Sequence, residues 1–246
     1  ERLLGVRAER GAAEVVAEYG RLGLGELHLR PLWPVAPGRG EAGPWGVSPR
    51  EYLTFYGECL DALLARGEGA APMRERTAAM LLGKILRGED PGWPEVRPLY
   101  GGGLGELAYG MDGEVYPSDE ARLLCQEGRH ALFKLGGVDL PYKEVVGHPT
   151  VRALAAASDL EAQPMCSSCA YKPFCGVSPV YNLAAQGTIQ GRNPTNARCA
   201  QAMGVFDILF SRLRDPRARS ALETWTEPSP RETRQPPPAF LANGCL

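Results

Sequence analysis

Apolar residues recur with a helical period near the start of the chain and then alternate with polar ones. One face of residues 11–22 is apolar, which predicts an amphipathic helix. Two glycines, Gly23 and Gly25, follow it, and residues 26–30 (Glu-Leu-His-Leu-Arg) then alternate between polar and apolar, as a strand does. A helix, a glycine turn and a strand in this order predict an α/β unit of a parallel sheet or barrel.

Arg30 stands at the carboxyl end of that predicted strand. Parallel α/β sheets and barrels place their ligands at this end, so Arg30 is a candidate for substrate binding. An ion pair with a nearby carboxylate explains it equally well. His28 has no second residue at ligand spacing and is interpreted as a packed or solvated strand residue.

Two further helices are predicted before a break in the chain. Residues 31–47 are rich in proline and glycine and predict a loop. Ser48-Pro49-Arg50-Glu51 combines an N-cap, a first-turn proline and a capping-box glutamate, which predicts a helix through residue 64. A second helix is expected over residues 73–87, and the Pro/Gly-rich segment at 88–100 predicts a domain boundary.

Beyond the boundary, shorter elements are expected. Asp112-Gly113 is a hairpin turn signal between predicted strands at 104–109 and 114–116. Ser118-Asp119-Glu120 is a capping sequence for a short helix. The remaining expectations are a strand and turn at 133–137 and helices at 141–146, 149–158, 179–185 and 196–213.

Composition narrows the function classes. The 246 residues carry a net charge of −2 without a basic block, which gives no indication of a nucleic-acid partner. No apolar run approaches the roughly 20 residues of a membrane helix. The odd number of cysteines, 7, argues against a disulfide framework and for a reducing cytoplasm. The chain begins Glu1-Arg2-Leu3-Leu4, and we expect it to be the C-terminal part of something longer.

Four cysteines have the spacing of a metal site. Cys166, Cys169, Cys175 and Cys199 form the pattern C-x2-C-x5-C-x23-C, which can gather four thiolates around a tetrahedral zinc or an iron–sulfur cluster. Cys199 lies near the start of a predicted helix, whose N-terminus favours a thiolate. The other three cysteines are interpreted as a core thiol at Cys59, an apolar-face thiol at Cys125 and an incidental one at Cys245.

The second half of the chain resembles a known family. The segments GGGLGELAYGMDGEVYPSDEARLL, FKLGGV and CAYKPFCGVSPVYN, with the distant Cys199, resemble the SPASM extension of radical SAM enzymes, in particular the maturase of the His-Xaa-Ser peptide system. The resemblance covers residues 98–215, and residues 1–47 are more weakly similar to the end of a radical SAM partial barrel. It implies an α/β part, the end of a partial (β/α) barrel, followed by a small α+β SPASM-type domain.

The resemblance also assigns the metal. In SPASM enzymes the matching cysteines hold the second auxiliary cluster, which favours one auxiliary [4Fe–4S] cluster on Cys166, Cys169, Cys175 and Cys199, with zinc as the alternative. The ligands of the first auxiliary cluster are missing, because this chain has Gly101–Gly103, Ser118 and Ser178-Pro179 at their positions. One cluster is therefore predicted, not two.

Asp119 is the candidate catalytic residue that the resemblance implies. SPASM enzymes that oxidise a serine or cysteine side chain in sulfatases have an aspartate, the proposed general base, directly after the cysteine that Ser118 replaces. A carboxylate there can accept a substrate proton. Helix capping by Ser118-Asp119-Glu120 is the simpler explanation.

The chain lacks the C-x3-C-x2-C loop that binds the SAM-cleaving cluster. We therefore expect the C-terminal part of a radical SAM peptide- or protein-modifying enzyme, whose S-adenosylmethionine and second [4Fe–4S] cluster belong only to the complete enzyme. The expected parts are the barrel end at 1–97, the cluster domain at 98–225 and a mobile tail at 226–246. The expected partners are a peptide or protein substrate and an electron donor or acceptor protein, with no nucleic acid or membrane. Whether this chain alone is an enzyme stays open, and the alternatives are a metal-stabilised module that binds a peptide or partner, and an enzyme completed by a second polypeptide.

Overall fold

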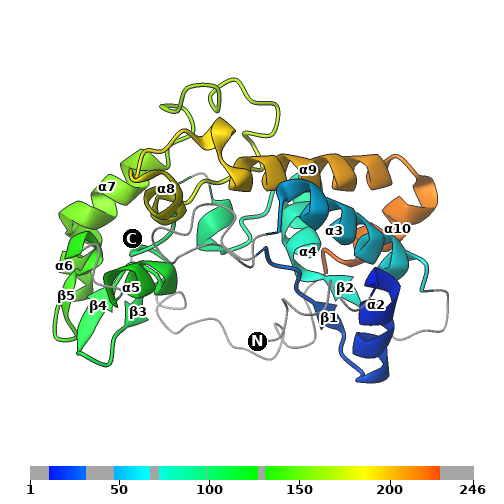
Figure 1. The fold of residues 1–246 in the computed structure, drawn as a ribbon, viewed down its shortest axis with the longest axis horizontal. Helices are drawn as coiled ribbons and strands as arrows, with labels where there is room; N and C mark the ends of the chain where they lie inside the picture. Colours follow the sequence, from blue (N-terminus) through cyan, green and yellow to red (C-terminus); the bar gives the residue numbers. More distant parts are fainter. Residues whose placement is uncertain (1–10, 32–46, 67–71, 98, 127–130, 228–246) are drawn as a thin grey trace.

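The computed structural model describes residues 11–31, 47–66, 72–97, 99–126 and 131–227. Their helices and short strands form two groups, and the long helix α9 starts between the groups and runs across the first one (Figure 1). The first group comprises α2 (Ala12–Arg21), β1 (Glu26–Leu27), α3 (Pro49–Leu64), β2 (Arg74–Glu75), α4 (Arg76–Leu82), α9 (Ala197–Leu213) and α10 (Pro216–Thr224). The second comprises β3 (Ala108–Tyr109), β4 (Glu114–Tyr116), α5 (Asp119–Gln126), β5 (Gly136–Gly137), α6 (Tyr142–Gly147), α7 (Pro149–Ala157) and α8 (Pro179–Gln186).

The predicted α/β unit at the start of the chain is confirmed, with a shorter strand. Helix α2 buries its apolar face, and β1 pairs in parallel with β2, with Glu26 opposite Arg74 and Leu27 opposite Glu75. The capping box of α3 is present as well: the Ser48 hydroxyl accepts from the Glu51 N–H at 3.2 Å, and the Glu51 carboxylate accepts from the Ser48 N–H at 3.0 Å.

The helix predicted over 73–87 is divided into three pieces. Two residues form β2, seven form α4, and the chain then widens into a π-helical turn at Gly83–Arg87. Gly88 ends it in the left-handed conformation at φ 68°. Lys84 lies within this π-turn, and its side chain donates to the Phe174 carbonyl, which is far away in sequence.

The hairpin of the second group is confirmed at Asp112-Gly113. Strand β4 pairs antiparallel with β3 on one side and with β5 on the other. Gly113 adopts φ 78°, which L-residues with a side chain rarely reach, so the Asp-Gly turn depends on it. Helices α5, α7 and α8 surround this small sheet and bury Tyr100, Tyr116 and Phe133.

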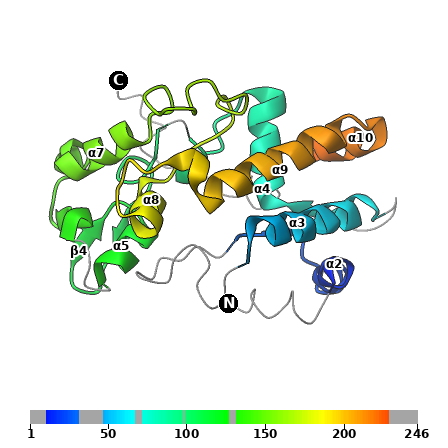
Figure 2. The ribbon, with the colours of Figure 1, turned by 45° about the horizontal axis from the view of Figure 1, so that its top comes forward.

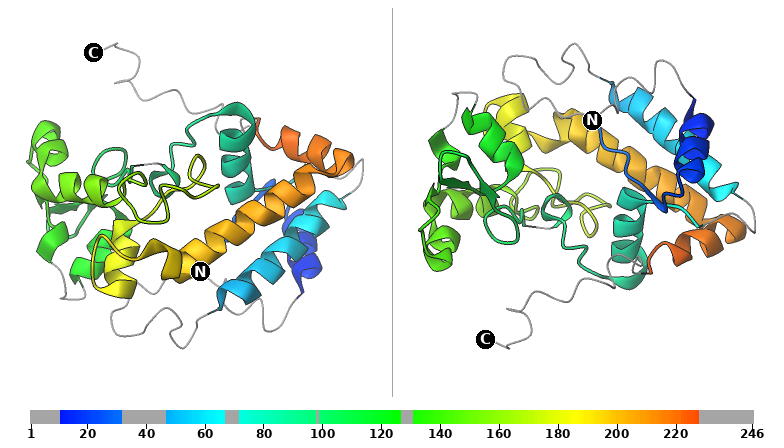
Figure 3. Two further views of the ribbon diagram at one scale, coloured as in Figure 1. Left: turned by 90° about the horizontal axis from the view of Figure 1, so that it is seen from above. Right: turned by 90° about the horizontal axis from the view of Figure 1, so that it is seen from below.

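Helix α9 belongs to the core of the first group. It buries Val205, Phe206 and Leu209 beside α3, and α10 adds Leu222 to the same core. Figure 2 shows α9 lying over α3 and α4, and the view from above in Figure 3 shows it running diagonally between them. Helix α10 has no counterpart among the sequence predictions.

The division into residues 1–97, 98–225 and a tail remains a prediction. The tail at 226–246 lies outside the described residues except for its first two, as do Cys245 and most of the loop predicted at 31–47. Among the helices of the described ranges, none is long and apolar enough to cross a bilayer.

Candidate metal centre

The first three cysteines lie on one compact loop between α7 and α8. The Cys169 N–H donates to the Cys166 carbonyl at 3.0 Å, which closes the C-x2-C turn. The Cys175 N–H donates to the Tyr171 carbonyl at 2.9 Å, which folds the third cysteine back over the first two. The loop thus gathers its thiols through local backbone hydrogen bonds, as the short spacing predicts.

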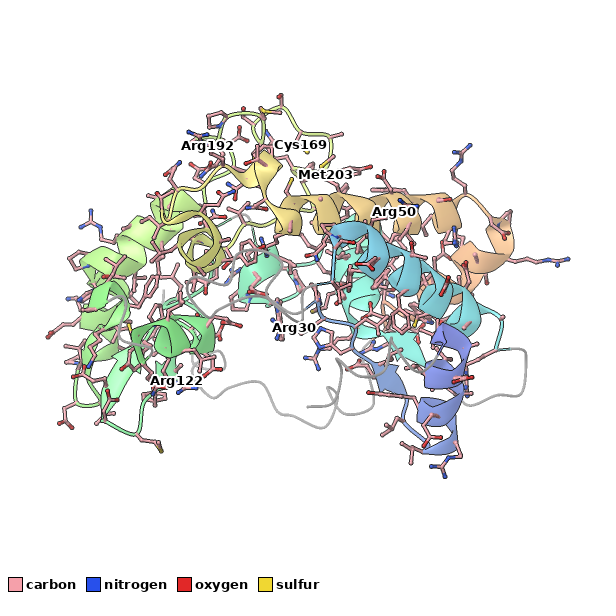
Figure 4. The ribbon with its side chains drawn as sticks, in the orientation of Figure 1. Arg30, Arg50, Arg122, Cys169, Arg192 and Met203 are labelled. Carbon is pink, nitrogen blue, oxygen red and sulfur yellow. The ribbon has the colours of Figure 1, made fainter. Side chains whose placement is uncertain are left out.

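Cys199 comes from the first turn of α9. The Asn196 side chain caps this helix by accepting from the Cys199 N–H at 2.8 Å. The Cys199 sulfur lies 3.8 Å from the Met203 sulfur, one turn further along. In Figure 4, Cys169 and Met203 lie beside each other above the start of α9, so the loop and the helix meet at this point.

All four cysteines line one cavity of about 40 Å³, and each is half-buried. The residues that share its lining with them are Leu160, Tyr171, Lys172, Gly176, Val177, Asn193, Asn196, Arg198, Ala202, Met203 and Phe206. Within the described ranges, no three His, Cys, Asp or Glu side chains converge closely enough to hold a single metal ion. The thiols therefore surround a space and do not meet at one point.

Three buried asparagines, none of which the sequence analysis singled out, fix the wall of this cavity. Asn196 Nδ2 donates to Asn182 Oδ1 at 3.0 Å, and Asn182 Nδ2 donates to Asn193 Oδ1, also at 3.0 Å. Gly191 packs so closely that a Cβ there would lie 2.6 Å from Asn182 Nδ2. Asn193 is only 3% exposed, and its own Nδ2 has no partner in the part of the chain that the structure describes.

Burial disfavours the charged form of three of the thiols. It raises the pKa of Cys166 and Cys175, and together with the neighbouring thiols it raises the pKa of Cys199 to about 11. Thiolates in such a site need a bound cation to offset their charge, because binding to a metal is what deprotonates a buried thiol.

Two cations hold the segment around Cys175 in place. Lys84 donates to the carbonyls of Val96 and Phe174, and Arg198 donates to those of Glu95 at 2.8 Å and Gly176 at 2.7 Å. Each cation therefore joins residues 95–96 to residues 174–176. Gly176 permits this approach, since a Cβ there would lie 2.6 Å from two backbone oxygens.

Aromatic rings attach the loop to α9. The Tyr171 ring stacks on Phe206 with centroids 5.1 Å apart, and Phe174 lies 5.8 Å from Phe210. The Tyr171 hydroxyl also donates to Asp207. Because α9 is anchored in the first core, the cysteine loop is fixed to that core as well.

Asp119 and Arg30, the other predicted site residues, do not contact each other. Asp119 occupies the first turn of α5, where it is exposed and pairs with Arg122 at 2.7 Å. The Ser118 hydroxyl accepts from the Ala121 N–H, so the capping function of this sequence is present. Neither the catalytic role of Asp119 nor the substrate role of Arg30 is tested by these contacts.

Arg30 faces two carboxylates from other elements. Its guanidinium lies 3.5 Å from Glu95 and 3.8 Å from Glu120, and 5.6 Å from the centroid of the Trp93 ring. In Figure 4, Arg30 appears below the cysteine loop, between the two groups of elements. Burial raises the pKa of Glu95 to about 7, so this carboxyl exchanges a proton near neutrality. Nothing in the local sequence around Glu95 indicated this, because its environment comes from distant segments.

Gly102, Ser118 and Ser178, three of the positions that the resemblance to SPASM enzymes singled out, have structural roles here. Ser118 is fully buried, and Ser178 caps α8 by accepting from the Tyr181 N–H at 3.2 Å. The ring of Tyr100 fills the space beside Gly102, where a Cβ would lie 2.3 Å from it.

This chain is similar in fold to proteins of solved structure. It matches no protein-family model and no curated protein. Three similar solved structures are native anSMEcpe with bound AdoMet (TM-score 0.63), with AdoMet and the Kp18Cys peptide (0.61), and with AdoMet and the Cp18Cys peptide (0.60), each 16% identical in sequence. The alignments cover 90% of this chain and 55–56% of the other, so this chain spans little more than half of those proteins. The likeness shows the fold: a mixed helix-and-sheet architecture that matches radical SAM enzyme structures over most of the chain.

Proposed function

We propose that this chain is the C-terminal part of a radical SAM peptide- or protein-modifying enzyme and carries one auxiliary [4Fe–4S] cluster. The observation that carries the proposal is the gathering of Cys166, Cys169, Cys175 and Cys199 around one cavity. The structural likeness to anSMEcpe, solved with AdoMet and with peptides, supports the enzyme class. The sequence resemblance to the maturase of the His-Xaa-Ser system gives the finer assignment that we propose.

The residues present fit the cluster in three respects. Four thiols provide a complete set of protein ligands, the partly or fully buried cations Lys84 and Arg198 bond to carbonyls beside the third of them, and Asn193, whose Nδ2 has no partner in the described residues, lines the same space. A tetrahedral zinc needs four sulfurs about 2.3 Å from one point. Thiols arranged around a space favour a cluster of several iron atoms over zinc.

When bound, the cluster supplies one-electron chemistry. A full set of four cysteine ligands leaves no iron open to a substrate, which favours electron transfer over direct ligation. The chain's own residues would bury the site, hold the ligands and separate them from solvent. Four cysteines that must stay reduced to act as ligands favour a reducing compartment, and we propose the cytoplasm.

We propose one cluster and not two. At the positions of the further ligands, Ser118 and Ser178 act as helix caps, and the Tyr100 ring occupies the space beside Gly102. These side chains contribute to the packing of the second group and replace the thiols that a second site would need.

The substrate is proposed to lie near Arg30. Arg30, Glu95 and Glu120 place charged groups from three elements beside one another, and Asp119 directly precedes Glu120 on α5. A carboxylate here can accept a proton from a substrate, with Asp119 as the candidate base. S-adenosylmethionine and its cluster would be bound by the rest of the enzyme, and an electron carrier protein would exchange electrons with it.

The test is the metal content of the protein purified without oxygen. We expect iron and acid-labile sulfide in near-equal amounts, a visible absorption band, and loss of both on Cys169→Ala, because one missing ligand leaves the set incomplete. Cys125→Ala, which removes a thiol outside the cavity, is the matched control and should keep its iron. Zinc without iron or sulfide would instead support a metal-stabilised binding module, and unchanged iron in Cys169→Ala would refute the ligand assignment.

A further inference from the structure

Asn193 has a buried hydrogen-bond donor with no acceptor among the residues that the structure describes. The side chain is 3% exposed and lines the cysteine cavity, and its Nδ2 lacks a partner within the described ranges. A buried amide N–H without an acceptor is costly, and native proteins rarely retain one without a reason. The donor therefore indicates that an acceptor is present when the site is filled.

The hydrogen-bond chain fixes which end of the Asn193 amide is free. The Cys199 backbone N–H can only donate, so Asn196 must present Oδ1 to it and its Nδ2 to Asn182. Asn182 must then present its own Nδ2 to Asn193, where Oδ1 accepts it at 3.0 Å. Turning the Asn193 amide over would place two donors against each other, so its Nδ2 remains as the unused group.

The other residues that line the cavity limit which kind of acceptor Asn193 Nδ2 can meet. The four thiols are the anionic groups of the cavity once they are deprotonated, and the rest of its lining is largely apolar. An oxygen ligand would have to displace one of these thiols or leave them unpaired. A thiolate or an inorganic sulfide is the acceptor that the cavity itself supplies when a cluster is bound.

We propose that Asn193 Nδ2 donates a hydrogen bond to a sulfur of the bound auxiliary cluster and thereby raises its reduction potential, an inference that rests on the function proposed above. Hydrogen bonds to sulfur withdraw negative charge and stabilise the reduced cluster. Asn193 touches no iron, so it is a positioning and tuning residue. The hydrogen bonds from Cys199 through Asn196 and Asn182 set the orientation of the Asn193 amide. One hydrogen-bond network therefore holds both a cluster ligand and the donor that adjusts the potential.

The test compares Asn193→Leu with the wild-type full chain, both purified without oxygen. Leucine keeps the approximate shape of asparagine and removes the donor. We expect the variant to keep its iron, to lose one exchangeable-deuteron coupling in pulsed electron–nuclear spectra of the reduced cluster, and to be reduced less readily by up to tenfold, which is about 59 mV for a one-electron couple. An unchanged potential and an unchanged coupling would overturn the proposal.

A second measurement uses the metal-free chain. If Asn193 Nδ2 serves only the bound cluster, Asn193→Leu should lower the urea midpoint of the metal-free chain by no more than the one hydrogen bond that Asn182 Nδ2 loses with Asn193 Oδ1, since removing the unpartnered donor offsets part of that loss. Asn182→Leu is the control, because both Nδ2 and Oδ1 of Asn182 make hydrogen bonds within the chain. This variant should unfold at a lower urea concentration than the metal-free wild type. A midpoint for Asn193→Leu as low as that of Asn182→Leu would assign the amide to the fold and contradict the proposal. The absence of iron and sulfide from the wild type would instead defeat the proposed function itself.

Discussion

Glu75 is a fully buried carboxylate that joins three elements of the first group. Oε1 accepts from the Leu29 N–H at 3.0 Å, and Oε2 accepts from the Tyr56 hydroxyl at 2.8 Å and the Ala78 N–H at 2.6 Å. Burial raises its pKa, while these three donors oppose the rise. Glu75 thus fixes the end of β1 against α3 and α4, the region from which Arg30 projects.

Removing this carboxylate should destabilise the protein strongly. Glu75→Ala leaves three buried donors unsatisfied, and we expect a loss of about 3 kcal/mol or more in the free energy of unfolding. Tyr56→Phe removes a single hydrogen bond from the same cluster and should cost about 1 kcal/mol. Urea unfolding measures both, and equal losses for the two variants would contradict the central role of Glu75.

Glu95 makes stability depend on pH near neutrality. Its pKa is raised from 4.5 to about 7 by burial, with Arg198 and Arg30 opposing the rise. The folded state therefore binds the proton more tightly than the unfolded state, and stability that is present below pH 4.5 is lost as the pH rises through about 7.

Glu95→Gln should remove that loss. A shift of this size corresponds to about 3 kcal/mol between the two limits, since one pKa unit is about 1.4 kcal/mol. Unfolding free energies of wild type and variant, measured by urea at intervals from pH 4.5 to 8, should diverge across this window, with the variant the more stable at pH 8. Parallel curves for the two proteins would show that Glu95 is not protonated more readily in the folded state.

Among the elements, the π-helical turn at Gly83–Arg87 matters most for the candidate metal centre, because its Lys84 donates to the carbonyls of Val96 and Phe174. Lys84→Met keeps the apolar stem and removes the bridge, leaving two buried carbonyls without this donor. We expect a loss of about 1–3 kcal/mol in unfolding free energy and a lower iron content.

Two comparisons separate the bridge from simple loss of charge. Lys84→Arg retains donors and should recover part of the iron content. Lys172→Met removes the same charge from another residue of the cavity lining, but Lys172 pairs with Glu161 near the surface at 2.8 Å, and such pairs contribute about 0–1 kcal/mol. A Lys172→Met variant as impaired as Lys84→Met would mean that charge, and not the bridge, is what the site requires.

How far the sequence predicts these elements depends on how local their causes are. The helices at α2, α3 and α9 follow from apolar periodicity, and the hairpin follows from Asp112-Gly113. The gathering of the first three cysteines follows from their spacing, because short backbone turns suffice to make it, whereas Cys199 arrives on α9 through the ring packing between the loop and that helix. The π-turn has no such local signature, and the acceptors of its Lys84 lie on segments distant in sequence.

Other features were missed for equally specific reasons. Helix α10 is polar on most of its surface and buries only Leu222, so its apolar periodicity is weak. The sequence indication of its start was Asp215-Pro216, an N-cap followed by a first-turn proline. Glu95 and Glu120 lie 65 or more positions after Arg30 in the sequence, so no local pattern reveals that these three residues form a cluster. The unused donor of Asn193 is visible only once its two asparagine neighbours are in place.

For the molecule as a whole, α9 links the cysteine cavity to the first core. Its first turn carries Cys199, and later turns bury Val205, Phe206 and Leu209 beside α3. The cysteine loop packs its own aromatic rings on the same helix. A change at the cavity should therefore reach elements that do not touch it.

If the proposed cluster is bound, removing its iron should loosen α9 and α3 together with the cysteine loop. Metal binding adds its free energy to the stability of the folded state, and regions packed on the metal-bound element share that stabilisation. Chelation should therefore speed amide hydrogen exchange in residues 159–178, along α9 and on the face of α3 beneath it. Exchange in β3, β4 and β5, which α9 does not support, should change least. The same chelator added to Cys169→Ala should have no effect, because that variant is expected to bind no iron. Faster exchange restricted to residues 159–178 would mean that the loop opens by itself and that α9 does not transmit the state of the metal site to the rest of the protein.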